Sequence, residues 1–235
     1  SSAASDVYKR QSYGKKLYLS FNTMVGPFEV DIAYRILDRI MKEISPSALI
    51  LNDLSLITFA VKNGWEVHVS LGSTVINSWD VLFWSDVGAK RVVLSPHLVD
   101  DELREILKVN RDIEVMIYGV KCGFTYTGIC RMSSYFDLVM RSSITRSTVW
   151  EGSSKRSGIC FKPCAQEWHS DGGKVRIEPI FYMCYDLVQL VDMGVRYFKI
   201  GGRGLPVREL ERIIVLIKSI IKGERGGEIC TFNAR

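Results

Sequence analysis

The sequence predicts an α/β protein whose strands and helices alternate as in a (β/α)8 barrel, that is, a TIM-barrel-like fold. Three observations lead to this prediction. Short β-branched or aromatic runs alternate with stretches whose apolar residues recur at helical spacing. One strand and one helix together occupy roughly 20–30 residues, about what one unit of such a barrel needs. The chain has 235 residues, 47% of them hydrophobic, which suffices for one sizeable core.

Six strands are expected, each rich in β-branched or aromatic residues. They are LYLSFN (17–22), ALILN (48–52), WEVHVS (65–70), RVVLS (91–95), IEVMIYG (113–119) and YFKIGG (197–202). Helices are expected at 28–44, 53–63, 77–87, 98–109, 184–193 and 206–222. Helical crossovers between consecutive strands make the strands parallel. In the first helix an isoleucine stripe is expected to cover one face of the sheet, at Ile32, Ile36, Ile40 and Ile44.

Six strands are two fewer than a closed barrel contains, so either the barrel is opened or two N-terminal units are missing from this chain. The small, polar start of the chain lacks the apolar segment of about 7–15 residues that a secretory signal requires. No apolar run approaches the roughly 20 residues of a membrane span. The expected organisation is a disordered or cloning-derived lead (1–15), an incomplete barrel domain (16–225) that contains a cysteine-rich insertion (122–184), and a C-terminal tail (226–235).

Five of the six cysteines lie in or beside the segment that interrupts the alternation. Without a secretion signal they are expected to be reduced thiols in the cytoplasm. Each of them alone suits a small buried apolar residue. Three of them, however, stand beside Arg or Lys in polar loops, which are poor places for apolar filling. The five are Cys122, Cys130, Cys160, Cys164 and Cys184.

Four thiolates can hold either zinc or an iron–sulfur cluster. Structural zinc usually uses two close cysteine pairs, whereas clusters tolerate irregular spacing. Cys160 and Cys164 form one close pair, and the interval from Cys122 to Cys130 is too wide for a second. The spacing therefore favours an iron–sulfur cluster slightly and leaves zinc open.

Polar residues at the ends of the expected strands are candidates for substrate binding, because ligands bind at the carboxyl ends of barrel strands. Two have an alternative role: Asp53 equally suits a helix cap, and His68 a hydrogen-bonded core residue. The turn KIGGRG (199–204) offers backbone amides for an anion, or is simply a tight connection. The candidates are Asn22, Asp53, His68, Lys199 and Arg203.

The net charge of +5 permits binding to nucleic acid without arguing for it. The run RSSITRSTVWEGSSKR (141–156) could contact RNA phosphates, with Trp150 stacking on a base. A solvated loop is the alternative for this run.

Three segments of the chain resemble peptidase family U32, the collagenase-like proteins: EVMIYGVKCGFTYTGICRMSS (114–134), GICFKPC (158–164) and MCYDLVQLVDMGVRYFKIGGR (183–203). The agreement runs in order from about residue 16 to 203. The resemblance implies two further N-terminal units, so that this chain would supply strands three to eight of the barrel. It also implies a four-iron four-sulfur cluster held by Cys122, Cys130, Cys160 and Cys184, with Cys164 as an alternative ligand.

Family members carry out oxygen-independent hydroxylation of a tRNA uridine, a ribosomal RNA cytidine or a ubiquinone precursor. The resemblance thus implies a cytoplasmic iron–sulfur protein that hydroxylates an RNA base or an aromatic or quinone precursor. One alternative is a collagenase-like peptidase, although the chain shows neither a nucleophile pattern nor the motif HEXXH. The other is a non-catalytic cluster-bearing or RNA-binding subunit that acts with a partner subunit of the same family.

Four positions depart from the family pattern. Tyr118 replaces a histidine, Ile129 an arginine, His97 an acidic residue and Gly201 a glutamate. Because these positions lie near the expected substrate, the identity of the substrate cannot be carried over from any one family member.

Overall fold

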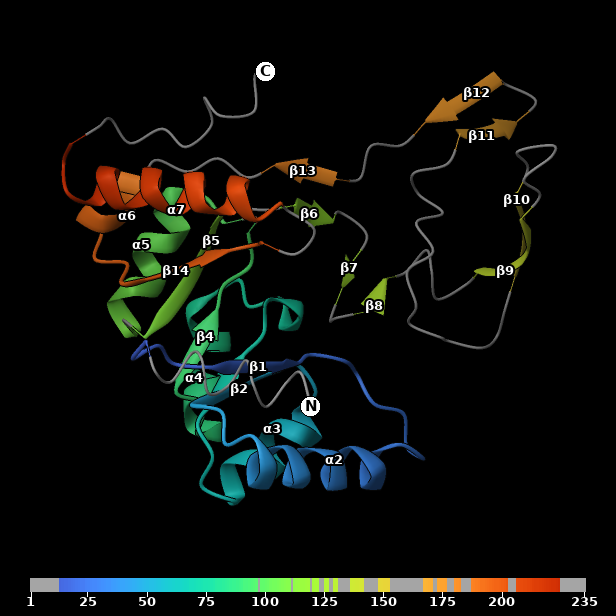
Figure 1. Cartoon of the computed structure of the whole chain (residues 1–235), viewed down its shortest axis with the longest axis horizontal. Coiled ribbons are helices and arrows are strands. Elements are labelled where there is room, and N and C mark those ends of the chain that lie inside the picture. The colour runs from blue at the N-terminus through green and yellow to red at the C-terminus, as the bar shows by residue number, and fades with distance from the viewer. Residues whose placement is uncertain are drawn as a thin grey trace.

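The computed structural model describes most of the chain between residues 13 and 224 (Figure 1). Between 120 and 182 the description covers the backbone alone, and the expected tail lies outside the described residues. The described residues are 13–96, 98–110, 112–118, 120–122, 125–126, 129–130, 136–141, 148–152, 167–170, 173–176, 180–182, 187–202 and 206–224.

The main sheet has six parallel strands, as the alternating pattern predicts. Each strand lies beside its predecessor until the chain returns from the long insertion and adds β14 next to β5. β1 and β14 are therefore the two edges of a sheet that is visibly curled (Figure 1). The strands are β1 (Tyr18–Phe21), β2 (Ala48–Leu51), β3 (Val67–Val69), β4 (Arg91–Val93), β5 (Ile113–Tyr118) and β14 (Tyr197–Ile200), each inside its expected range.

Helices connect the strands and pack on the outer face of the sheet (Figure 1). Each lies inside its expected range: α2 (Val30–Glu43), α3 (Leu54–Lys62), α4 (Ser78–Val87), α5 (Asp100–Val109), α6 (Leu187–Asp192) and α7 (Val207–Ile221); a short 3-10 turn, η1 (Leu71–Ser73), precedes α4. The end of α4 requires glycine, because Gly88 has a φ of +105° and a Cβ there would lie 2.6 Å from the side chain of Val61.

The hydrophobic core lies between the outer face of the sheet and these helices. Side chains alternate along a strand, so on β2 the fully buried Leu49 and Leu51 belong to this core while Ile50 points to the concave face. The largest fully buried side chains are Leu37, Leu49, Leu51, Leu56, Ile57, Leu94, Ile106, Ile113, Ile117, Leu187, Leu190 and Ile213.

The isoleucine stripe of α2 covers the sheet only in part: Ile40 packs against the core, but the first two isoleucines do not. Ile32 and Ile36 are 52% and 41% exposed, whereas Ala33 and Leu37 are buried. The reason is geometric: residues spaced by four advance about 40° around a helix at each step, so a row of four leaves the buried face. The helix is amphipathic, but its buried stripe is one residue further along the chain.

The insertion between β5 and α6 interrupts the alternation, as expected, and forms small antiparallel pairs (Figure 1). The pairs are β6 (Val120–Cys122) with β13 (Ile180–Tyr182), β7 (Thr125–Tyr126) with β8 (Ile129–Cys130), β9 (Phe136–Arg141) with β10 (Thr148–Gly152), and β11 (Glu167–Ser170) with β12 (Gly173–Arg176). Across the part of the chain that the structure describes, no helix has both the length and the apolar character needed to cross a membrane.

Candidate functional site

Polar side chains gather where the parallel strands end. Asn22 follows β1, Asn52 follows β2, Ser70 follows β3 and Ser95 lies just beyond β4. Two hydrogen bonds join neighbouring loops: Asn22 Nδ2 donates to Ser70 Oγ at 3.4 Å, and Ser73 Oγ donates to Asn52 Oδ1 at 2.7 Å. Since parallel strands end at the same edge of a sheet, these residues form one polar face, the position where barrel proteins bind ligands.

Asp53 lies at this face, but its carboxylate accepts hydrogen bonds from backbone N–H groups of the same chain. It caps α3 by accepting hydrogen bonds from the backbone N–H groups of Ser55 and Leu56, at 2.9 and 3.3 Å. Its second oxygen accepts from Val25 N at 3.2 Å and so ties the loop after β1 to the start of α3. The helix-cap role considered for Asp53 is therefore present in the structure; its role toward a substrate stays a prediction.

The turn that carries the first two cysteines lies at the same face. Cys122 ends β6, and Cys130 pairs across the β7–β8 hairpin with Thr125, only three residues beyond Cys122. Cα atoms of β7 and η1 lie within 8 Å of each other, so the hairpin sits over the carboxyl end of β3. On the other side of β6, Ile180 of β13 lies opposite Cys122. The other predicted ligands, Cys160, Cys164 and Cys184, lie outside the described residues, so the convergence of the four thiolates stays a prediction.

Lys199 lies on the concave side of β14 rather than in the open. Its Nζ is 4.0 Å from Glu114 Oε1, and its side chain is 26% exposed. Arg203, its predicted companion, lies outside the described residues. Two of the positions that depart from the family pattern meet here, because Gly201 N donates to the carbonyl of Tyr118 at 2.6 Å.

His68 does not reach the strand-end face; it is buried on the concave side of β3, where it is 1% exposed. Its Nε2 lies 2.9 Å from Glu66 Oε1, and the ring of Tyr18 meets the imidazole edge-on at 4.8 Å between centroids. Burial lowers the pKa of His68 below the ordinary value of 6.5, although the hydrogen bond that the imidazole donates to Glu66 acts in the opposite direction. The imidazole is therefore neutral at pH 7, with Nε2–H donating to the carboxylate.

Arg91 is the central residue that sequence reasoning missed. Its guanidinium stacks on the ring of Tyr197, with Cζ 3.5 Å from the ring centroid, and its Nη1 lies 3.4 Å from Glu114 Oε2. Strict alternation along β4 and β5 could have found it, since it places Arg91 and Glu114 on the face opposite the buried Val92 and Ile113.

The other departures from the family pattern are Ile129, of which the backbone in β8 is described, and His97, which lies outside the described residues.

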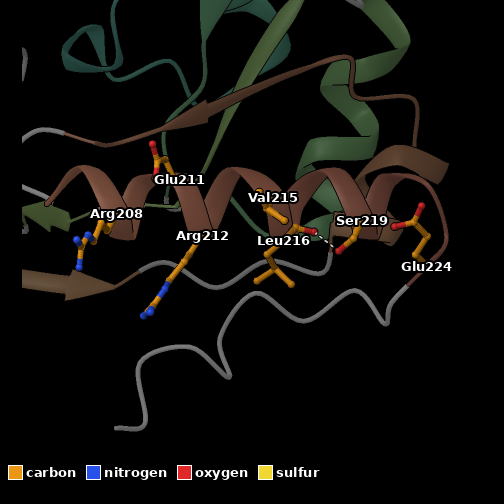
Figure 2. Close-up of a pocket in the computed structure, with 7 residues that line it drawn as sticks. All are labelled: Arg208, Glu211, Arg212, Val215, Leu216, Ser219 and Glu224. Atoms are coloured by element: carbon orange, nitrogen blue, oxygen red, sulfur yellow. Dashed lines mark hydrogen bonds between the residues drawn. The ribbon is translucent and has the colours of Figure 1, made fainter.

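A groove of about 670 Å³ lies along α7 in the helix layer (Figure 2). All its described lining residues belong to α7 or the turn after it, with Arg208 and Arg212 extending from the helix: Arg208, Glu211, Arg212, Val215, Leu216, Ser219 and Glu224. Because its described lining includes neither the polar strand-end residues nor the cysteines of the turn, this groove is not the candidate site.

These features define a class of protein: an α/β protein with a curled parallel sheet and a polar site at the carboxyl ends of its strands. The chain belongs to peptidase family U32, whose family model matches residues 4–229. The resemblance read from the cysteine segments and the last strand is thereby confirmed.

Relatives within this family have different functions. The chain is 33% identical over 131 residues to tRNA hydroxylation protein P of Haemophilus influenzae, covering 54% of this chain and 28% of the relative. It is 27% identical to the 23S rRNA 5-hydroxycytidine C2501 synthase of Escherichia coli, over 81% of this chain and 28% of the relative. It is 26% identical to a collagenase of Porphyromonas gingivalis, over 81% of this chain and 47% of the relative. The chain thus spans less than half the length of each of these proteins.

Proposed function

We propose that this chain is the cluster-bearing part of an enzyme that hydroxylates a base in RNA. The observation that carries the proposal is the position of the Cys122–Cys130 turn, which lies against η1 at the strand-end face. Relatives named for tRNA hydroxylation and for rRNA hydroxycytidine synthesis support RNA as the substrate class. The proposed setting is the cytoplasm, and the proposed complete fold is an eight-stranded barrel of which this sheet forms six strands.

The donor set suits a four-iron four-sulfur cluster better than a hard cation, because cysteine sulfur is the ligand that such clusters use, whereas hard cations take oxygen ligands. Cys122, Cys130, Cys160 and Cys184 would hold it, with Cys164 as the alternative to one of them. When bound, such a cluster supplies one-electron redox chemistry next to the substrate.

The residues at the face have separate tasks in this proposal. Asn22 is exposed and presents an amide group that can bind the polar edge of a base, and the buried Ser70 holds that amide by accepting its hydrogen bond. Lys199 and Arg203 would bind an anionic group such as an RNA phosphate. The cap at Asp53 holds the loop that carries Asn22 by its hydrogen bond from Val25 N.

Anaerobic purification followed by iron and sulfide analysis tests the cluster directly. We expect about four iron and four sulfide per chain, and loss of most of both in Cys122→Ser, Cys130→Ser, Cys160→Ser and Cys184→Ser. Cys230→Ser is the matched control and should retain the metal, and Cys164→Ser tests the alternative ligand. Stoichiometric zinc, or no metal in anaerobic protein, would contradict the cluster.

The collagenase among the relatives keeps a peptidase as the second candidate. Gelatin hydrolysis that survives the cysteine substitutions and chelation would favour it. Mass spectrometry of nucleosides tests the leading candidate, because hydroxylation adds one oxygen to a base. The RNA is incubated anaerobically with the complete protein and a cell extract that supplies the oxygen donor and accepts the two electrons. A chain that holds the cluster and binds RNA but supports neither reaction would be the non-catalytic subunit.

A further inference from the structure

The short turn η1 is held at both of its ends by residues where strands end. Ser70, which precedes η1, accepts a hydrogen bond from Asn22 Nδ2 at 3.4 Å, and its own N–H donates to the carbonyl of Leu51 at 2.7 Å. Ser73, the last residue of η1, donates from Oγ to Asn52 Oδ1 at 2.7 Å. Because Asn52 is buried, water has little access to compete for this hydrogen bond. The ends of β1 and β2 therefore fix η1 in place.

The residue after η1 has a backbone conformation that its side chain disfavours. Thr74 has a φ of +53° and a ψ of +50°, in the left-handed region that β-branched residues rarely adopt. The next residue, Val75, is buried and pairs with Leu94, and its carbonyl accepts from Ser95 N at 2.8 Å. Backbone strain of this kind persists only where the surrounding contacts determine the conformation. The shape of η1 is therefore set by its anchors on the neighbouring strands.

The hairpin formed by β7 and β8 lies against this turn. Cα atoms of β7 and η1 lie within 8 Å of each other, although the two elements are far apart in the sequence. The hairpin begins shortly after Cys122 and contains Cys130, two of the expected cluster ligands. At the other end of η1, Ser70 accepts the hydrogen bond from Asn22, a candidate substrate-binding residue. The anchored turn thus contacts the cysteine hairpin and also holds a candidate substrate-binding side chain.

We propose that Asn52 and Ser73 are positioning residues, whose hydrogen bond holds η1 as a platform that fixes the cysteine hairpin relative to Asn22. This inference rests on the proposed function, because it takes the hairpin to hold a cluster that acts on a substrate at the same face. Neither positioning residue has to touch the cluster or the substrate. Such support matters because a displacement of about 1 Å between reacting groups can lower a rate roughly 100-fold.

The two positioning residues can be removed one at a time. Ser73→Ala takes the hydroxyl donor from the buried Asn52 Oδ1, and Asn52→Ala takes the acceptor from the Ser73 hydroxyl. Loss of a hydrogen bond to a buried group should make local opening roughly tenfold easier. Since both substitutions break the same hydrogen bond, the double variant should open little more easily than either single variant.

Hydrogen exchange measured by mass spectrometry on the anaerobically purified protein tests the platform, whether or not the protein holds a cluster. We expect amides of the β7–β8 hairpin to exchange roughly tenfold faster in Ser73→Ala, while those of β2 keep their protection. Ser73→Thr keeps a hydroxyl and should restore slow exchange. Ser85→Ala is the matched control, because Ser85 Oγ accepts from Asn110 Nδ2 at 3.0 Å where α4 and α5 end, and it should leave the hairpin unchanged.

Release of iron to a chelator measures the effect on the cluster itself. Ser73→Ala and Asn52→Ala should release iron roughly tenfold faster than the natural sequence, and Ser85→Ala at the natural rate. If Asn52→Ala fails to fold, the comparison of Ser73→Ala with Ser73→Thr decides.

Three results would overturn the platform. The first is hairpin exchange that does not respond to Ser73→Ala, and the second is a response that β2 or Ser85→Ala shows equally. The third is a double variant in which the effects of Ser73→Ala and Asn52→Ala add in full. A protein without iron whose hairpin still responds to Ser73→Ala would contradict the proposed function but support the platform.

Discussion

The two faces of the main sheet differ sharply in chemistry although they belong to the same strands. The outer face, under the helices, is apolar and fully buried at residues such as Leu51, Val69 and Ile113. The concave face has His68, Arg91 and Glu114 at neighbouring positions of the adjoining strands. The outer face therefore supplies most of the hydrophobic stabilisation, and the concave face holds the groups that can respond to ligands and pH.

This division agrees with how a barrel is used. Helices can cover the outer face only if it is apolar, so little variation is tolerated there. The concave face leads to the strand ends, where Asn22 and the cysteine turn lie, and its charges are held by few contacts. Substitutions made on one face at a time test whether the outer face determines stability and the concave face determines function.

The largest effect is expected from neighbouring residues of β2 that point to opposite faces. Leu51→Ala should lower the free energy of unfolding by about 3 kcal/mol, since a fully buried leucine leaves a cavity in the outer core. Ile50→Ala, on the concave face and only half-buried, should cost about half as much. Urea denaturation measures both, and equal losses would mean that the concave face is packed as densely as the outer one.

A smaller loss is expected when the concave face loses its shared carboxylate. Glu114 is 13% exposed and lies 3.4 Å from Arg91 and 4.0 Å from Lys199, so Glu114→Gln removes a negative charge that faces both cations. We expect a loss of about 2 kcal/mol. Glu105→Gln is the matched control, because Glu105 pairs with Lys108 on the surface of α5 and should contribute under about 0.5 kcal/mol. If the two variants lose the same stability, the concave ion pairs are no stronger than surface ones.

Periodicity alone predicted the strands of the main sheet and the helices that cover it, but not the short strands β6–β13 of the insertion. Apolar runs separated by helical stretches are enough to place the strands, because each strand is buried under helices and has little freedom to be anything else. The concave cluster was not predicted, since Arg91 begins a strand whose remaining residues read as an ordinary apolar run, and its partners lie on strands far away in sequence. His68 was noticed for its residue type, and alternation already places Glu66, two residues earlier, on the same face. Its contact with Tyr18, two strands away, depends on the curl of the sheet.

For the cysteines the reverse holds: the sequence gives more information about their possible role than the backbone structure does. Their proposed roles as cluster ligands rest on the family resemblance, whereas the structure adds only that Cys122 and Cys130 flank a hairpin beside η1. The error at α2 has a simple origin. Spacing by four looks like a helical stripe over two turns but departs from the 3.6-residue period over three.

Helix capping gives the next test, because Asp53 belongs to the strand-end face yet supports the outer layer. Asp53→Ala should cost about 1–2 kcal/mol through loss of the cap on α3, and Asp53→Asn clearly less. Asn77→Ala removes a comparable cap, since Asn77 Oδ1 accepts from Asp80 N at 2.9 Å at the start of α4, and should cost about 1 kcal/mol. Thermal unfolding measures the losses. If Asp53→Asn keeps the stability but abolishes activity that Asn77→Ala retains, Asp53 also binds substrate.

The smallest effect is expected on the surface of α2. The spacing of the isoleucines predicted that Ile32 faces the sheet, but in the structure its side chain faces outward. Ile32→Gln should change the free energy of unfolding by less than about 0.5 kcal/mol, because the side chain is 52% exposed and contributes little to the outer core. Leu37→Ala on the same helix is the contrasting variant and should cost several times more, since Leu37 is fully buried. Urea denaturation of the two variants compares the stripes directly. A large loss in Ile32→Gln would show that Ile32 is covered in the functional protein, and the outer apolar layer would then extend beyond the edge strand β1.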